Sequence, residues 1–152
     1  MAFLTGQRLS ADLLNQNLQG VTTAVVTDSA AISAETVGIT VVIAVTAGQT
    51  YGITVKATIG SSAVGTLGTN LAIVRIREDS VSGNQLSQDV FTPLTSASAG
   101  FAYSTYTEYT AASTTTKTIV FTFARNTATT ETYIIRAAAN RPTFMRVQPL
   151  VN

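Results

Sequence analysis

The sequence predicts an all-β protein: an antiparallel β-sandwich of jelly-roll or immunoglobulin-like type, with one short helix near its N-terminus. Apolar and polar residues alternate along most of the chain, which is the pattern of half-buried strands. Charged residues make up only 11% of the sequence, and Thr, Ser and Val take their place, a composition typical of β-rich proteins. No second helical segment separates the expected strands, which disfavours parallel βαβ units.

Residues 9–19 carry the signals of the short helix. Ser10 is a good N-cap, and Leu9 and Leu14 occupy the positions of a hydrophobic staple. Gly20 stands where a helix commonly ends. A helix of this length is marginal in isolation, so its leucines must pack either on the chain's own sandwich or on a neighbouring molecule.

The chain divides into an N-terminal arm with a docking helix, residues 1–20, and a β-sandwich domain, residues 21–152. A segment that is too short to fold alone, yet carries a cap, a staple and a stop, is suited to become helical on docking. We expect this arm to be the main assembly element, because burial of its apolar side chains can drive attachment without charged contacts. These side chains are Phe3, Leu4, Leu9, Leu13, Leu14 and Leu18.

Eight or nine strands with short connections are expected after residue 20. The strongest pair covers residues 37–45 and 51–59, whose shared period of two on either side of a short turn predicts a hairpin. The other strands are expected at residues 22–28, 71–77, 86–91, 101–109, 118–124, 132–137 and 143–148. The expected core consists of Val37, Ile39, Val41, Ile43, Tyr51, Ile53, Val55, Phe121 and Phe123.

The residue types that most catalysis needs are missing. The sequence has no His and no Cys, which removes the commonest general base and the usual zinc and iron ligands. Glu78 and Asp79 are adjacent at a strand end, where extended backbone makes side chains diverge. The stretch 78–89 lacks the EF-hand spacing of a calcium loop. We therefore expect no catalytic residue, no metal site and no cofactor; the rival hypothesis, a glycan hydrolase, needs two carboxylates across a cleft.

Two arginines form the first candidate for a ligand or partner face. Arg75 and Arg77 project from the same face of one expected strand. There they could bind an anion or pair with acids on a partner. Alternatively, they form a surface ladder with Glu108 or Glu131 on a neighbouring strand.

Three tyrosines on one strand form the second candidate. Tyr103 and Tyr109 share a face, whereas Tyr106 takes the other. An exposed tyrosine platform could stack on sugar rings or serve as a protein interface. The alternative places Tyr103 and Tyr109 in the core with their hydroxyls at its rim.

Charge and hydropathy restrict the remaining partners. The net charge is only +1, which argues against nucleic acid because such binding needs clustered Lys and Arg. No apolar stretch approaches the roughly 20 residues that span a bilayer. Residues 1–6 lack the basic and apolar regions of a signal peptide. We expect neither nucleic acid nor a membrane as a partner.

Several short motifs resemble those of small structural proteins from bacteriophages that infect actinobacteria. The opening residues MAFLTGQRLSADLLN resemble their G-Q-x-L-T-A-x-x-L-N start, with Ser10 for the usual Thr and an extra Leu before Asn15. Three later segments resemble their A-G-x-x-Y, V-R-L-R-E and x-R-P-x-x-L elements: Ala47-Gly48-Gln49-Thr50-Tyr51, Arg75-Ile76-Arg77-Glu78 and Asn140-Arg141-Pro142-Thr143-Phe144.

The resemblance implies a non-enzymatic component of the virion surface, made in the host cytoplasm. The first candidate is a capsid decoration (cement) protein that docks through its N-terminal arm. The alternative is a minor tail protein that acts as a receptor- or carbohydrate-binding module. The implied partners are copies of the chain itself, as a homotrimer, together with the major capsid protein or tail proteins, and in the tail alternative a host surface glycan.

Overall fold

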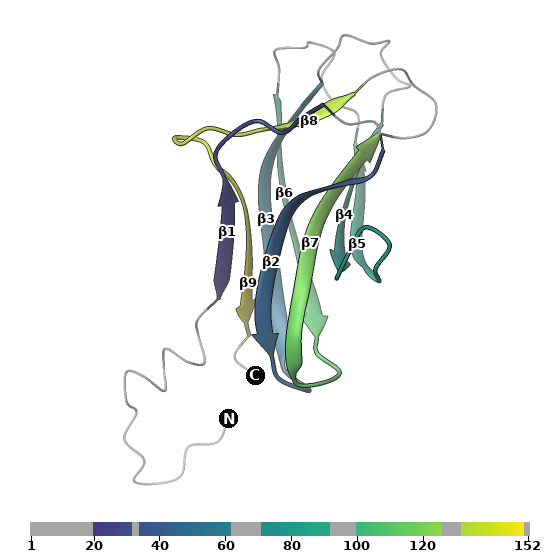
Figure 1. Ribbon diagram of the computed structural model, residues 1–152, viewed down its shortest axis with the longest axis vertical. Helices are drawn as coiled ribbons and strands as arrows, with labels where there is room; N and C mark the ends of the chain where they lie inside the picture. The colour runs from purple at the N-terminus through teal and green to yellow at the C-terminus, as the bar shows by residue number, and fades with distance from the viewer. Residues whose placement is uncertain (1–19, 32–33, 62–70, 92–99, 126–131, 151–152) are drawn as a thin grey trace, which may run out of the picture.

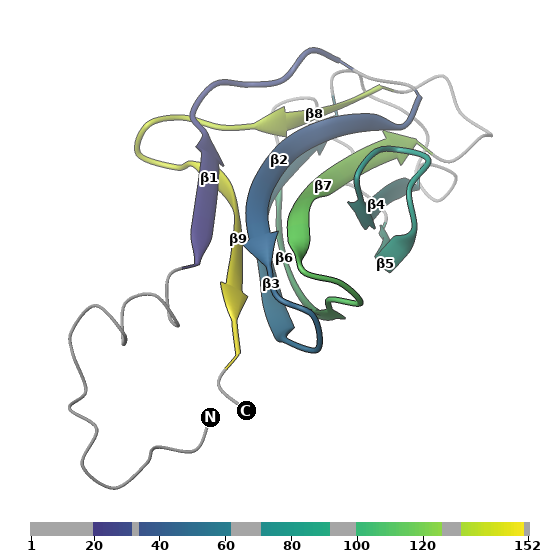
Figure 2. The same ribbon diagram turned by 60° about the horizontal axis from the view of Figure 1, so that its bottom comes forward.

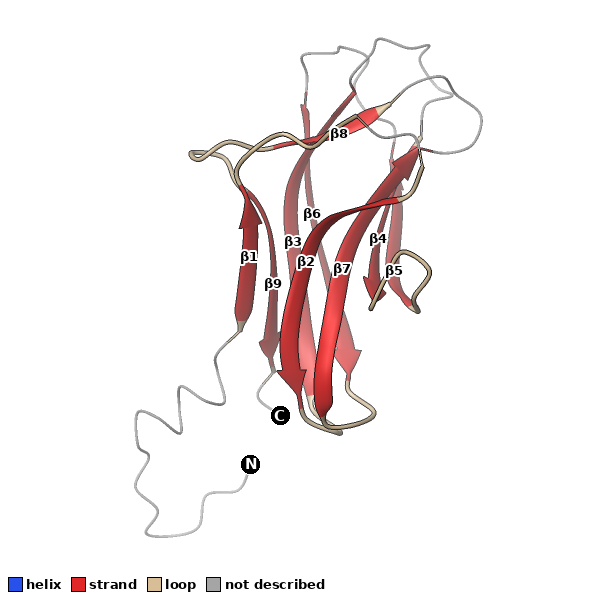
Figure 3. Cartoon of the chain, in the orientation of Figure 1, coloured by secondary structure: helices blue, strands red, loops and turns tan. Residues whose placement is uncertain are grey.

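The computed structural model describes residues 20–31, 34–61, 71–91, 100–125 and 132–150. These residues form strands and connections only, with no helix that could cross a membrane (Figure 3). The expected helix and the six apolar residues of the arm lie outside the described residues. The nine described strands are β1 (Val21–Val25), β2 (Thr36–Val45), β3 (Thr50–Ser61), β4 (Ala72–Glu78), β5 (Gln85–Phe91), β6 (Gly100–Thr110), β7 (Thr115–Arg125), β8 (Tyr133–Arg136) and β9 (Thr143–Pro149).

The strands form two antiparallel sheets that face each other across the core (Figure 1). One sheet has the order β1-β9-β3-β6, with β8 also paired to β3, and the other has the order β2-β7-β4-β5. Among the described strands, β4 and β5 are the one consecutive pair that is hydrogen-bonded. Apart from β4 to β5 and β8 to β9, each connection passes from one sheet to the other, which is the connectivity of a jelly roll and not of an immunoglobulin sandwich.

The expected hairpin between residues 37–45 and 51–59 is wrong. The two segments form β2 and β3, which belong to opposite sheets. Their turn contains Gly48 with φ of 77°, and its backbone N–H donates to the carbonyl of Ala111 at 2.8 Å. Because Ala111 begins the turn from β6 to β7, two crossings between the sheets are tied together at one end of the sandwich.

The core lies between the sheets and contains all but one of the expected residues. The exception is Val37, which is 39% exposed. A β-bulge causes this difference: Val37 pairs with Thr122 and Ile39 with Phe121, so Gly38 has no partner in the ladder and reverses the alternation. A Cβ on Gly38 would require the end of the Ile135 side chain to shift.

β8 and β9 lie end to end along the same side of β3. β8 pairs with residues 58–61 and β9 with residues 51–56 of that strand. Between β8 and β9 the chain turns away from β3 in a tight turn, where Ala138 and Arg141 exchange two backbone hydrogen bonds. The other side of β8 is covered by the connection from β1 to β2, because the Ser29 hydroxyl and the Asp28 carboxylate accept backbone N–H groups at residues 135 and 137.

Two adjacent valines of β2 test which face of the strand meets the core. Val41 is 0% exposed and Val42 is 54% exposed. Replacing Val41 with Ala should lower the free energy of unfolding by about 2 kcal/mol, because it removes two buried methyl groups and leaves a cavity. The same change at Val42 should alter it by less than about 0.5 kcal/mol. Denaturant unfolding measures both, and equal losses would contradict the assigned faces.

Candidate functional site

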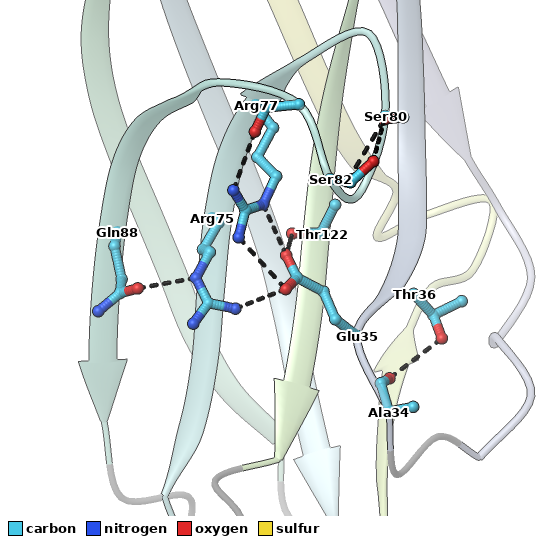
Figure 4. Close-up of polar contacts among 10 residues, drawn as sticks. Ala34, Glu35, Thr36, Arg75, Arg77, Ser80, Ser82, Gln88 and Thr122 are labelled. Carbon is cyan, nitrogen blue, oxygen red and sulfur yellow. Dashed lines mark hydrogen bonds and ion pairs between the residues drawn. The ribbon is translucent and has the colours of Figure 1, made fainter.

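The most developed polar cluster lies on the outer face of the β2-β7-β4-β5 sheet, where Glu35 meets two arginines (Figure 4). Glu35 directly precedes β2, and Arg75 and Arg77 project from β4. The Glu35 carboxylate accepts from Arg75 Nη1 at 2.7 Å and from Arg77 Nε at 2.9 Å. The Thr122 hydroxyl on β7 donates to the same carboxylate at 2.6 Å. One carboxylate thus joins three parts of the sheet.

The arginines of this cluster have further acceptors. Arg75 Nε donates to Gln88 Oε1 on β5 at 2.7 Å, and Arg77 Nη1 donates to the carbonyl oxygen of Gly83 at 3.0 Å. Only 15–21% of each charged side chain in the cluster is exposed. The predicted shared face of Arg75 and Arg77 is confirmed, but their donors are engaged within the chain and are poorly placed to capture an external anion.

The partner of the arginines differs from both expected acids. Glu108 lies on β6 in the other sheet, and Glu131 lies outside the described residues. Glu35 is the partner because the connection from β1 crosses to the second sheet before β2 begins. The sequence offers no signal for this contact, because alternation places Glu35 on the same side as Val37, a residue that the sequence predicts to lie in the core.

The cluster keeps Glu35 ionised. Burial alone raises the pKa of this carboxyl group. Hydrogen bonds from Arg77 and Thr122, together with the charges of Arg75 and Arg77, outweigh burial and hold the pKa below its ordinary value of 4.5. The cluster is therefore an ion pair with fixed geometry, suited to hold the crossing chain in place.

The three tyrosines of β6 do not form one platform. Tyr103 and Tyr109 are buried, as the core alternative predicted, and the Tyr103 ring stacks on Phe121 with 6.0 Å between centroids. The Tyr103 hydroxyl donates to Asp89 Oδ2 at 2.5 Å, so it links β6 to β5. Burial, aided by this carboxylate, raises the pKa of Tyr103. Tyr106 alone projects outward and is 54% exposed.

A second polar cluster lies at the end of the sandwich where β4 meets the turn to β5. Lys117 Nζ lies 3.4 Å from Glu78 Oε1 and 3.3 Å from Asp79 Oδ2. The expected divergence of Glu78 and Asp79 is therefore wrong. Asp79 adopts a left-handed backbone with φ of 64°, so the chain is not extended there and both carboxylates reach the same ammonium group.

This cluster borders an open hollow of ≈ 490 Å³, lined in part by Glu78, Glu108, Tyr109 and Lys117. Both carboxylates have partners: Glu78 pairs with Lys117, and Glu108 accepts from the Tyr106 hydroxyl at 3.0 Å. Within the described residues, no three acidic side chains gather closely enough to hold a metal ion. The hollow offers hydrogen-bonding groups at its rim and an internally paired lysine.

Comparison with known proteins leaves the family of the chain open. No family model matches the sequence, and no curated protein matches it. Fourteen chains of solved structures resemble the fold. One belongs to the structure of infectious bursal disease virus, Gx strain, with a TM-score of 0.46 and 12% identity. The match covers 88% of this chain and 32% of the other, so this chain spans about a third of that one; a likeness this distant carries no functional information.

Replacing Glu35 with Gln tests the cluster. The change should lower the free energy of unfolding by about 2 kcal/mol at neutral pH, because two partly buried arginines lose their counter-charge. A carboxyl group with a lowered folded-state pKa stabilises the fold above its ordinary pKa, and the effect disappears as the pH falls through the folded value. The difference between the two proteins should therefore shrink below pH 4.5.

Denaturant unfolding over a pH series measures this difference. The control is Glu108→Gln, which alters an exposed carboxylate without an arginine partner and should change stability by less than about 0.5 kcal/mol. A Glu35→Gln deficit that persists unchanged into acid would contradict an ionised Glu35 as the source of the stabilisation.

Proposed function

We propose that the chain is a non-enzymatic structural protein of a bacteriophage particle, and specifically a capsid decoration protein that docks through its N-terminal arm and through contacts between subunits. The observation that carries this proposal is the chemistry of one face. The outer face of the β2-β7-β4-β5 sheet exposes apolar side chains beside two arginines that already bind acceptors within the chain. Such a face can be covered by another subunit at little electrostatic cost.

The exposed apolar side chains of this face lie on both of its edge strands. Val37 and Val42 on β2 are 39% and 54% exposed, and Val90 on β5 is 47% exposed. Between them lies the Glu35 cluster, in which two arginines share one carboxylate and have further acceptors within the chain. Covering unpaired charges is costly, whereas covering valines and threonines releases water favourably. Interface cores are likewise poor in unpaired charge.

The positions of the phage-like motifs also support the proposal. The Ala47–Tyr51 motif contains Gly48, the positive-φ residue in the turn where the chain crosses between sheets. The Arg75–Glu78 motif supplies both arginines of the Glu35 cluster. The Asn140–Phe144 motif includes part of the tight turn before β9. Each motif therefore falls where this jelly roll depends on particular residues, which favours a shared architecture with the proteins that carry them.

The tail alternative has its own supporting observation, the exposed ring of Tyr106 on the opposite sheet. A receptor-binding module of a tail would present such an aromatic group to a sugar or a protein. The number of copies of the protein in each purified particle distinguishes a capsid location from a tail location. Quantitative mass spectrometry against the major capsid protein should give hundreds of copies for a decoration protein and only a few for a tail-tip component.

Deleting residues 1–19 tests the arm. The described strands begin at Val21, so the truncated protein should remain a folded sandwich. It should no longer join particles or its own oligomer, because the proposed docking leucines are gone. Circular dichroism checks the fold, sedimentation checks the oligomer, and mass spectrometry of particles checks incorporation. Leu14→Asp together with Leu18→Asp should reproduce the loss, whereas normal incorporation of the deleted form would refute the arm's role.

Replacing Val42 and Val90 with Asp tests the sheet face. Both side chains are exposed, so the monomer should fold, but each new carboxylate would have to lose water in an interface. Self-association or particle incorporation should fall by about tenfold or more. The control, Ala102→Asp, adds a carboxylate to an exposed position of β6 in the other sheet. Equal loss from the control would show that this face has no special role.

A further inference from the structure

We propose that the outer face of the β1-β9-β3-β6 sheet is a binding site for an acidic saccharide, in which Tyr106 supplies the stacking surface and Lys56 and Arg146 bind the carboxylate of the sugar. The three residues lie on three adjacent strands, β6, β3 and β9. This is the sheet opposite to the one proposed above for subunit contacts, so the two proposals can fail separately.

The Tyr106 ring is held against the sheet by contacts at Gly52, Leu150 and Glu108. Its Cε2 and hydroxyl atoms each lie 3.0 Å from where a Cβ on Gly52 would stand. The Leu150 side chain approaches the same point, also at 3.0 Å. The Tyr106 hydroxyl donates to Glu108 at 3.0 Å. The ring therefore rests over a glycine, held at its hydroxyl end, and still leaves 54% of the residue exposed.

Lys56 and Arg146 have no acidic partner in the part of the chain that the structure describes. Lys56 faces Phe144 across the β3–β9 ladder, and Arg146 faces Thr54, so the two cations are diagonal neighbours on one exposed face. Within the described residues, no carboxylate forms an ion pair with Lys56 or Arg146, whereas Arg75, Arg77, Lys117 and Arg136 all form one. Neighbouring like charges on a sheet repel each other, and a bound anion relieves that repulsion.

The register places the stacking group and the cations at a distance that one sugar can bridge. Thr54 pairs with Arg146 on one side and with Tyr106 on the other. Arg146 and Tyr106 are thus two strand spacings apart, or roughly 10 Å between backbones. The Tyr106 ring lies over Gly52 of the strand between them, and the long Arg146 side chain can reach toward a ligand on that ring. Thr54 and Ser104 are small and leave the surface between them open. A sugar ring over Tyr106 can therefore direct a carboxylate toward Arg146 and Lys56.

A saccharide fits this face better than an acidic protein surface. Glu108 beside the ring can accept hydrogen bonds from sugar hydroxyls, and Thr54 can both donate and accept. An acidic protein patch would instead meet the negative charge of Glu108. Aromatic faces next to hydrogen-bonding groups bind the apolar face of a sugar ring while its hydroxyls are satisfied at the edge.

The test is calorimetric titration of the full chain with three probes: a short oligomer of galacturonic acid, the matched neutral oligomer of galactose, and a polyglutamate peptide. The uronic acid oligomer should bind, and its affinity should fall with added salt because exposed charges are screened. Tyr106→Ala should weaken binding by about tenfold through lost stacking, whereas Tyr106→Phe should retain it. Lys56→Gln with Arg146→Gln should weaken it by about tenfold or more.

The matched control is Arg141→Gln, which removes one exposed cation from the turn before β9, outside the three-strand site. It should leave the affinity unchanged within about twofold, and circular dichroism should confirm that every variant is folded. Three outcomes overturn the proposal: no binding of the uronic acid oligomer, equal binding of the neutral oligomer, or equal binding of polyglutamate. The last would assign the face to an acidic protein partner instead.

Discussion

Burial of one face of each sheet against the other is the constraint from which the rest of the molecule follows. Because most connections cross between the sheets, neither sheet can unfold without disrupting the strands of the other. The turn at Gly48 and the turn after Ala111 lock two of these crossings together. The charge-poor sequence suits this arrangement, since paired strands satisfy their own backbone and need few ionic contacts to specify the fold.

β7 extends this constraint beyond the interior. It is buried on both sides, because Ile119 and Phe121 enter the core while Val120 and Thr122 on the opposite side are also covered. The outer cover includes the Glu35 cluster, which joins the two inner strands of the sheet, β7 and β4 (Figure 4). Figure 2 shows the bend of β2 and β7. A carboxylate in this position must be paired, which accounts for the two arginines that alternate along β4.

The sequence predicted the strands well and their partners poorly, for a physical reason. Alternation reports which side of a strand is apolar, so the nine strand positions and the inward side of β3 and β7 followed directly, whereas alternation leaves open the side of β6 that carries Tyr103 and Tyr109. It does not report whether two apolar faces lie side by side or opposite each other, hence the false hairpin between β2 and β3. The prediction that Val37 lies in the core is wrong because a bulge at Gly38 changes the alternation within one strand. The Glu35 cluster depends on where the connection before β2 crosses the sandwich, and the contact of Asp79 with Lys117 depends on a left-handed turn. Neither feature leaves a periodic pattern in the sequence.

The two outer faces of the sandwich differ in the apolar and charged side chains that they expose. On the β2-β7-β4-β5 side Arg75 and Arg77 share the Glu35 carboxylate and valines are exposed, so contact with another subunit removes apolar surface beside arginines that already have acceptors in the chain. On the β1-β9-β3-β6 side Lys56 and Arg146 keep their charges available beside Tyr106. Covering that side with an ordinary subunit interface would bury two uncompensated cations, which is costly. In the proposed assembly, a subunit anchored by its β2-β7-β4-β5 face would turn the other face toward solvent, where the proposed anionic ligand could reach it.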